Sequence, residues 1–315
     1  MTSLLTNNAA MTALQTLTQT NKSLQMTQSH ISTGLRVSSA QDNAAYWSIA
    51  TTMRSDRAAL STVQDALGLG SGTVDTAYTG LSKTIEVVSA IKTKLVAARE
   101  PGVDRTKVQS EITALQSQLQ NQADASVFSG ENWLAIDSSA TGYNATKSVV
   151  ASFTRSSGTV AFGTISIDLT STALYDASAS AEGIIDGTRD STGAIVGSGG
   201  GSGTFSVANI DISALTDSSA DLTTLEGYIQ GVDTALGEVT DAAASLGAVK
   251  SRIDIQKSFV SSLMDAIDRG VGQLVDADMN EESTKLQALQ VQAQLGVQAL
   301  SIANQASQNI LSLFR

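Results

Sequence analysis

Apolar side chains return every three or four residues through most of this chain of 315 residues. This alternation is the heptad pattern of helices that pack against one another along a narrow apolar seam. The clearest run starts at Leu60 and continues to Leu95, before Glu100, Pro101 and Gly102 stop it. The run predicts a helix of roughly 40 residues, about 60 Å long at 1.5 Å per residue.

The same spacing predicts two further helices. The shorter one is indicated by four apolar residues, Val108, Ile112, Leu115 and Leu119. The short loop that precedes it favours an antiparallel pairing with the first helix. In the last third of the chain the alternation runs from Leu225 to Leu274 and predicts a third long helix, with Lys250 and Lys257 expected at seam positions.

The two chain ends carry heptad stripes whose polar faces are almost free of charge. The stripes include Leu14, Leu17, Leu24, Ile31 and Leu35 at the start and Leu286, Leu289, Ala293, Gly296, Leu300, Ala303, Ile310 and Phe314 at the end. Lys22 is the only Lys, Arg, Asp or Glu before Arg36, and none lies between Lys285 and Arg315. Such thin stripes bury too little surface to offset the entropy of ordering a helix. We expect both ends to be disordered in a monomer and helical when packed with copies of themselves.

The middle of the chain, about residues 141–224, loses the helical period. Residues 148–153 and 159–170 alternate between apolar and polar as strands do, and the Gly- and Ser-rich segment 197–203 is typical of a flexible loop. The predicted fold is therefore mainly α. Both chain ends form an elongated, hairpin-shaped rod of coiled coil and helical bundle, and a small β-containing outer domain is inserted in the middle.

The composition removes several classes of function. The chain has no cysteine and a single histidine, His30, so cysteine-ligated metals, thiol nucleophiles and most catalytic triads are excluded. A net charge of −11 opposes binding to a phosphate backbone. No stretch approaches the length of a membrane span, and the N-terminus lacks the pattern of a cleaved secretory signal. We expect no enzyme activity, cofactor, metal, nucleic acid or membrane partner.

Two short motifs have simpler explanations than a ligand site. Residues 276–283 begin like a calcium loop, but Glu281 stands where the loop needs Gly and Gln287 where it needs a bidentate Glu. We interpret this segment as a solvated helix start. Residues 68–72, GLGSG, lack the strand and the G-K-[ST] ending of a phosphate loop, so we interpret them as small residues within the long helix.

Both termini resemble bacterial flagellins. Residues 31–50, ISTGLRVSSAQDNAAYWSIA, follow the family pattern S-x-G-x-R-I-x-S-A-x-D-D-A-A-x-x-x-I-A, with Val37 for Ile and Asn43 for the second Asp. Residues 299–315, ALSIANQASQNILSLFR, are similar to the family's closing block, with Phe314 for the last Leu. The resemblance covers about residues 1–136 and 225–315.

The resemblance implies a domain plan. Residues 1–40 and 275–315 would form the two halves of an inner coiled-coil layer, and residues 41–140 and 225–274 the two halves of a helical rod domain. Residues 141–224 would be the variable, surface-exposed outer domain. The implied function is a structural subunit that polymerises head-to-tail into the flagellar filament used for swimming. The implied location is extracellular, after type III flagellar export without a cleaved signal peptide.

The implied partners are further copies of the chain, other flagellins, the flagellar cap and hook-associated proteins, and an export chaperone on the C-terminal helix. The residues inferred to take part in assembly are Leu14, Leu17, Leu24, Ile31, Gly34, Leu35, Arg36, Asp42, Leu289, Leu300, Ile310, Leu311, Phe314 and Arg315. Two alternatives stay open at the level of sequence: a hook-filament junction protein of the same family, and a surface-displayed adhesin.

Overall fold

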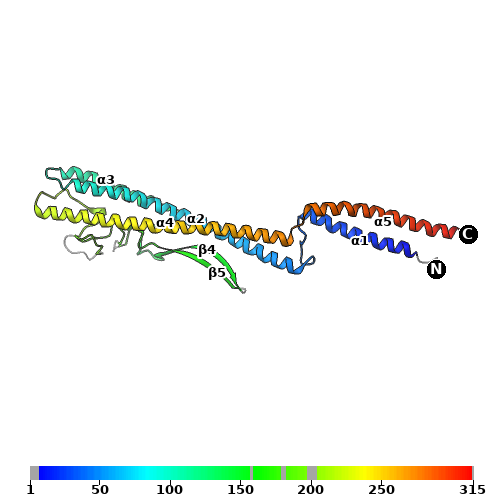
Figure 1. Ribbon diagram of the computed structural model, residues 1–315. Helices are drawn as coiled ribbons and strands as arrows, with labels where there is room; N and C mark the ends of the chain where they lie inside the picture. The colour runs from blue at the N-terminus through cyan, green and yellow to red at the C-terminus, as the bar shows by residue number, and fades with distance from the viewer. Residues whose placement is uncertain (1–6, 157–158, 179–181, 197–203, 314–315) are drawn as a thin grey trace. The chain divides into compact units, whose positions relative to one another are not determined.

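Five α-helices account for most of the residues in the computed structural model, which describes residues 7–156, 159–178, 182–196 and 204–313 (Figure 1). The helices are α1 (Asn8–Thr33), α2 (Ala44–Ala97), α3 (Arg105–Ala125), α4 (Ser219–Val275) and α5 (Met279–Leu313). Beyond residue 305 only the backbone of α5 is described. The mainly helical class with a small strand-containing middle is confirmed. The loop predicted at 197–203 lies outside the described residues.

The chain divides into two compact units. Unit 1 comprises Met1–Ala58 and Leu263–Arg315, and unit 2 comprises Ala59–Ser262. Unit 1 therefore contains both chain ends, and unit 2 contains the middle of the chain. None of the helices within the described ranges is long and apolar enough to span a membrane.

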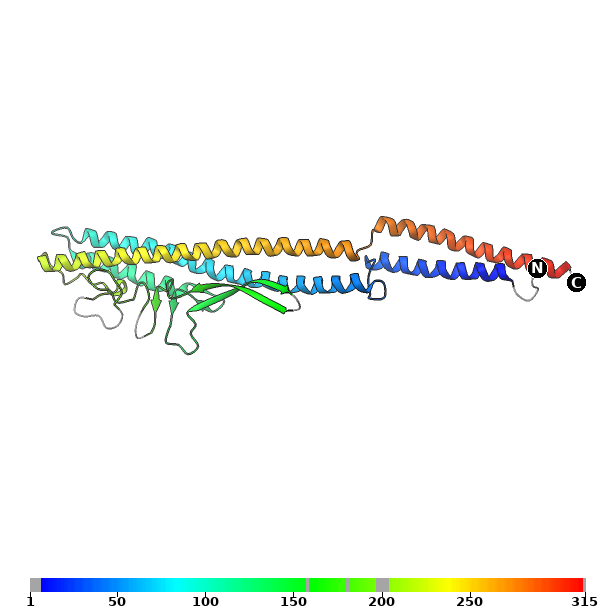
Figure 2. The same cartoon turned by 60° about the horizontal axis from the view of Figure 1, so that its bottom comes forward.

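In unit 1, α1 and α5 lie side by side and antiparallel (Figures 1 and 2). The Asn7 side chain caps the start of α1 by accepting a hydrogen bond from the amide of Ala10 at 3.0 Å. Gly34 ends the helix in the left-handed conformation, with φ of 74°, and its amide donates to the carbonyl of His30. Both ends of α1 are thus set by the residue types that cap helices.

The first turns of α2 and the last turns of α4 also belong to unit 1, and they share a small apolar core. Its buried members are Val37, Ala50, Val271 and Val275, and Leu35, Met53, Ile267 and Leu274 pack against them. The α2 helix is 54 residues long and begins at Ala44, well before the predicted start at Leu60. The Asn43 side chain caps it by accepting from the amides of Ala45 and Tyr46.

In unit 2, α3 and α4 each run antiparallel to α2. Lys94 pairs with Glu111 near one end of α3, and Gln122 donates to the carbonyl of Gly80 near the other, which confirms the predicted hairpin. The predicted third long helix is confirmed as α4. The seam positions expected for the two lysines are wrong, because Val249 is the buried residue beside Lys250 and Lys257 is exposed. Lys250 lies beside the seam and forms an ion pair with Asp75 of α2, with Nζ 2.6 Å from Oδ1.

The middle segment forms three small two-stranded sheets. They consist of β1 (Val127–Phe128) with β2 (Glu131–Asn132), β3 (Ala135–Ile136) with β6 (Tyr175–Asp176), and β4 (Thr146–Ser156) with β5 (Thr159–Asp168). Among these described strands, β3 and β6 pair in parallel, and the other two pairings are antiparallel. The β4–β5 hairpin pairs Thr146 with Asp168 and has an irregularity between Val150 and Ser152. It confirms the strands predicted from alternation.

Small residues let this segment approach α2 closely. A Cβ atom added to Gly70 would lie 2.5 Å from Cγ1 of Val149, and one added to Gly80 would lie 2.4 Å from Cδ1 of Leu134. The glycines of α2 thus provide space for the hairpin and its neighbours, and the GLGSG segment is helical, as predicted.

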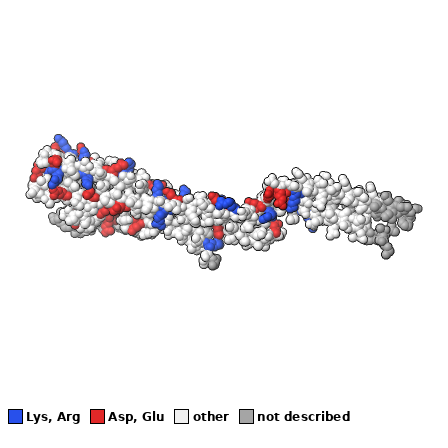
Figure 3. All heavy atoms as spheres, viewed as in Figure 1, with Lys and Arg blue, Asp and Glu red and all other residues white. Residues whose placement is uncertain are grey.

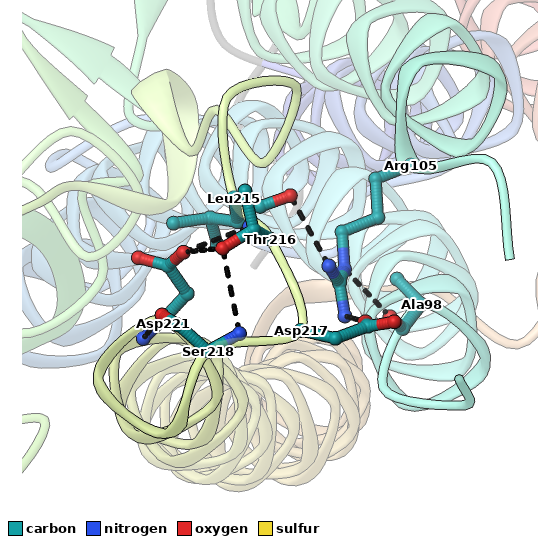
Figure 4. A network of polar contacts seen from close by, with 7 residues as sticks. All are labelled: Ala98, Arg105, Leu215, Thr216, Asp217, Ser218 and Asp221. Atoms are coloured by element: carbon teal, nitrogen blue, oxygen red, sulfur yellow. Dashed lines mark hydrogen bonds and ion pairs between the residues drawn. The ribbon is translucent and has the colours of Figure 1, made fainter. Parts of the chain in front are cut away.

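A buried arginine joins the helix ends of unit 2 (Figure 4). Arg105, at the start of α3, donates to the carbonyls of Ala98 and Leu215 at 3.0 and 3.1 Å and to the carboxylate of Asp217 at 2.7 Å. Next to it, Asp221 in the first turn of α4 accepts from the amide and hydroxyl of Thr216. These contacts fix the loop that leads into α4.

Candidate assembly surface

The α1–α5 seam has the predicted heptad spacing. It comprises the half-buried or buried residues Ala10, Ala13, Leu17, Thr20, Leu24, Thr27 and Ile31 of α1 and Glu282, Leu286, Leu289, Ala293, Gly296, Leu300 and Ala303 of α5. At one end the Asn7 amide group donates to the carbonyl of Ala303 at 3.0 Å. At the other end His30 Nδ1 lies 3.1 Å from Glu282 Oε1. The register therefore places the start of α1 beside Ala303, about three turns before the end of α5 at Leu313.

The seam is thin. The buried residues of α1 are Thr20 and Thr27, and the fully buried apolar residues of the described chain include none from α1 or α5. Gly296 lets Leu17 approach, because a Cβ there would lie 3.2 Å from Cδ1 of Leu17. Half-buried leucines and small residues give little apolar burial for two helices of 26 and 35 residues.

The outer surface of the pair combines absent charge with exposed apolar side chains. Figure 3 shows charged groups gathered near the start of α5, while the described surface of both helices beyond them is mostly uncharged. Among the described residues, the exposed large apolar side chains are Met11, Leu14 and Met26 on α1 and Met279, Val291, Leu295, Val297 and Ile302 on α5. A surface of this kind favours contact with other protein, since no charge must be desolvated there.

The segments that link α1 to α2 and α4 to α5 bind each other through their backbones. The amides of Arg36 and Val37 donate to the carbonyl of Val275 at 2.7 and 3.2 Å, and the amide of Ala277 donates to the carbonyl of Gly34 at 3.0 Å. We call this set of bonds the clasp. It joins the two halves of the chain at the base of the α1–α5 pair.

Side chains of the flagellin-like motif support the clasp. The Arg36 guanidinium donates to the carbonyls of Gln273 and Leu274, in the last turn of α4, at 3.4 and 3.2 Å. Asp42 accepts from the amides and hydroxyls of Ser38 and Ser39. Hydrogen bonds from Ser39 and Ser38 lower the pKa of the Asp42 carboxyl below its usual value.

A small charged cluster lies at the start of α5. Glu282 is buried, and its carboxylate contacts His30 of α1 and, at 3.7 Å, Lys285 one turn later. Burial would raise the pKa of Glu282, but the hydrogen bond from His30 and the charge of Lys285 outweigh it, so this pKa is lowered. Asp278 caps α5 by accepting from the amides of Asn280 and Glu281. The segment is a helix start, as predicted, although Glu282 within it is not solvated.

The structure brings most of the predicted assembly residues together in unit 1. Leu17, Leu24, Ile31, Leu289 and Leu300 lie in the seam, and Gly34, Leu35, Arg36 and Asp42 lie in the link between α1 and α2. Leu14 is exposed beside the seam rather than within it. Ile310 and Leu311 belong to the part of α5 whose backbone alone is described, and Phe314 and Arg315 lie outside the described residues. Their part in assembly stays a prediction.

Sequence reasoning missed three features of this surface. Thr20 and Thr27 lie on the seam as polar residues, so a search for apolar spacing passes over them. The pairing of His30 with Glu282 joins residues at opposite ends of the chain and leaves no local signal. The exposed apolar residues of α5 do recur at heptad spacing, and a search for a second stripe in the sequence would have found them.

Within the described residues no group of His, Asp and Glu could hold a metal ion.

A thin seam between helices from the two chain ends, with an uncharged and partly apolar exterior, is typical of a subunit that assembles through its ends. Residues 4–138 match the family model described as bacterial flagellin N-terminal helical region, and residues 229–314 match the bacterial flagellin C-terminal helical region. The chain belongs to the bacterial flagellin family.

Full-length relatives agree with this assignment. The chain is 51% identical to "Flagellin C" and 47% identical to "Flagellin A" of Rhizobium meliloti (strain 1021), each over all of both chains. It is 48% identical to "Flagellin" of Brucella melitensis biotype 1, again over all of both chains. The chain is thus a structural subunit of the flagellar filament used for swimming, and its family is one of structural proteins that polymerise into this extracellular filament.

Proposed function

We propose that the α1–α5 pair is the part of the subunit that drives assembly, with residues 1–40 and 275–315 as the inner coiled-coil layer. Residues 41–140 and 225–274 are then the helical rod domain around it, and residues 141–224 the outer domain. The observation that supports this division is the uncharged, partly apolar exterior of a helix pair whose own seam is thin. The rest of the chain has ordinary buried cores and exposed ion pairs.

Folding of the ends is coupled to assembly in this proposal. Ordering a residue costs about 1–2 kcal/mol, and the thin seam does not offset that cost over two whole helices. Contacts with neighbouring copies supply the missing apolar burial, so the ends become helical when a subunit meets a growing filament. A head-to-tail contact that does not close on itself gives a helical polymer.

The finer partners follow from the same proposal. The subunit leaves the cell through the flagellar type III apparatus without a cleaved signal peptide. An export chaperone binds the C-terminal helix until then. The cap and hook-associated proteins contact the same uncharged ends as the neighbouring subunits do, and other flagellins can join the same filament.

The missing charges would also suit the wall of a channel through which unfolded chains pass. Several Lys or Glu residues placed on the polar faces of residues 14–31 and 289–311 should therefore reduce export and assembly together. Secreted protein and filament length would be measured in a strain that depends on the variant. Unchanged export and filament length would contradict this part of the proposal.

Negative-stain electron microscopy of purified protein seeded with filament fragments tests the proposal directly. The intact chain should extend the seeds, whereas a chain lacking residues 1–35 and 286–315 should stay monomeric with a folded unit 2. Extension by the truncated chain would contradict a role of the ends in assembly. If neither chain extends the seeds, the better explanation is either a hook-filament junction protein or a need for a second flagellin.

A further inference from the structure

The α5 helix carries a second apolar stripe, on the face opposite its seam with α1. Its members each follow a seam residue by two positions, and they are Ala288, Val291, Leu295 and Ile302. Two positions correspond to about 200° around an α-helix, so these residues face away from α1. Val291, Leu295 and Ile302 are 56%, 58% and 66% exposed. We call this set the outer stripe.

The outer stripe repeats the design of the seam itself. Its residues are separated by three, four and seven positions, as in a coiled coil, and no Lys, Arg, Asp or Glu follows Lys285 until Arg315. A helix with heptad stripes on two faces packs against two partners at once. One partner, α1, is present in the chain. The residues of unit 1 that the structure describes leave the outer stripe of α5 exposed.

A complementary face lies on α1. Three residues each follow a seam residue by one position: Met11, Leu14 and Thr18. They form a face about 100° from the seam, which we call the α1 flank. Met11 and Leu14 are exposed. Together with Leu289 and Gln292 of α5 they line a depression of about 800 Å³ in the surface of the pair. This α1 flank is uncharged except for Lys22, which lines the same depression.

The way the family polymerises selects between the two possible contacts. If the outer stripe packed on the outer stripe of a second copy, the contact would be isologous and would close as a dimer. If it packs on a different face of a second copy, the contact is heterologous and can repeat without end. A single kind of contact builds a filament only in the second arrangement.

We propose that the outer stripe of α5 in one subunit packs on the α1 flank of the next, around Met11 and Leu14. The occupant of the outer stripe is thus a second copy of this chain. This inference rests on the proposed role of the ends in assembly and adds which two faces meet. The outer stripe belongs to the C-terminal end of one subunit, and the α1 flank belongs to the N-terminal end of the next. Each subunit therefore has one face for the subunit before it and another face for the subunit after it.

Paired charge substitutions test the proposal in seeded polymerisation of the purified full-length protein, measured by sedimentation. Leu295→Glu and Leu14→Lys should each lower the pelleted fraction about tenfold or more, since each buries an unpaired charge. The double variant should regain much of the loss, because the two charges then face each other across the contact. Gln294→Glu and Thr12→Lys are the matched controls, because both positions are exposed and neutral and Thr12 does not line the depression. Both should sediment as the unchanged protein does.

The outcomes separate this proposal from the broader one. If the unchanged protein extends the seeds but Leu295→Glu extends them equally well, the outer stripe is not an assembly contact. If both single variants fail and the double variant recovers nothing, the outer stripe and the α1 flank do not meet. If the unchanged protein itself does not extend the seeds, the proposed self-assembly of this chain fails, and the choice of faces fails with it. Circular dichroism of each monomer checks that unit 2 stays folded.

Discussion

Arg189 is completely buried in unit 2, where it ties the middle segment to α4. Its guanidinium donates to the carbonyls of Ile184 and Gly193 at 2.7 and 2.8 Å and forms an ion pair with Glu238 of α4. A buried guanidinium is tolerated when its charge is paired and most of its donors are bonded. Both terminal nitrogens of Arg189 have partners, whereas its Nε is buried without one among the described residues. One side chain thus links three separate pieces of backbone.

Arg189→Met should destabilise unit 2 by about 3 kcal/mol, because two buried carbonyls lose their donor and Glu238 loses its partner. Urea unfolding would be followed by the fluorescence of buried Trp133 in a Trp47→Phe background. The control is Lys92→Met, which removes a partly exposed ion pair with Asp233 and should cost less than about 1 kcal/mol. Equal losses in the two variants would contradict the role given to Arg189.

Glu282 gives the α1–α5 pair a dependence on pH. Its pKa is lowered from the usual 4.5 in the folded chain, so its contribution to stability is complete above pH 4.5 and is lost as the pH falls through the folded-state pKa. Filaments of Glu282→Gln should be weaker at neutral pH and lose less on acidification. The fraction sedimenting would be measured from neutral pH to pH 3, with exposed Glu281→Gln as control. Identical pH curves for Glu282→Gln and the unchanged protein would contradict this.

At the scale of single elements, α2 shows how a helix can be shaped by what packs on it. Gly68 and Gly70 are two positions apart, yet a Cβ at Gly68 would meet no atom within 4 Å, whereas one at Gly70 would collide with Val149 of β4. Helix propensity favours alanine at both positions by up to about 1 kcal/mol. Packing should reverse that preference at one of them.

We therefore expect Gly68→Ala to raise the free energy of unfolding of unit 2 by up to about 1 kcal/mol. Gly70→Ala should lower it by about 1–3 kcal/mol, because the added methyl group overpacks the contact with the hairpin. Urea unfolding followed by the fluorescence of Trp133 measures both. Changes of the same sign at the two positions would mean that β4 does not pack on α2 as described.

The elements that were predictable from sequence are those whose packing repeats along the chain. The heptads of α2, α3 and α4 and the alternation of β4 and β5 each recur often enough to be recognised. The first turns of α2 were missed because their buried position is Ala50, which is too small to mark a stripe. The two-residue strands β3 and β6 are paired by tertiary contact across many residues, so no local pattern marks them.

The candidate site was predictable for a different reason. Heptad spacing placed Leu17, Leu24 and Ile31 on the seam, and the missing charges indicated that the ends need partners. The family motif singled out Gly34, Arg36 and Asp42. The sequence does not reveal their physical roles, because these depend on the meeting of the two links in the clasp. Gly34 is a left-handed helix cap, Arg36 donates to the end of α4, and Asp42 caps a turn.

At the scale of the whole molecule, the two units should differ in stability when the subunit is free. Unit 2 buries large residues such as Leu67, Leu81 and Ile91, whereas the buried residues of α1 are two threonines. A monomer should therefore keep unit 2 folded while its ends open, since local stability follows buried apolar contact.

Limited proteolysis with a protease of broad specificity tests this difference. The ends should be removed rapidly from monomers, and unit 2 should remain, whereas filaments should keep both ends intact. Mass spectrometry of the fragments locates the cuts. Filament and monomer of the same protein serve as controls for each other. Equal resistance of the ends in monomer and filament would contradict folding coupled to assembly.

The clasp has a consequence for errors in synthesis. It joins Gly34 near the beginning of the chain to Ala277 near its end, and the α1–α5 pair beyond it needs residues that are made last. A chain that ends between residues 262 and 275 would contain all of unit 2 but would lack the residues that close the clasp and form α5. If the ends drive assembly as proposed, we expect such incomplete chains to be rejected at the growing tip, so that the filament accepts only chains whose synthesis has been completed.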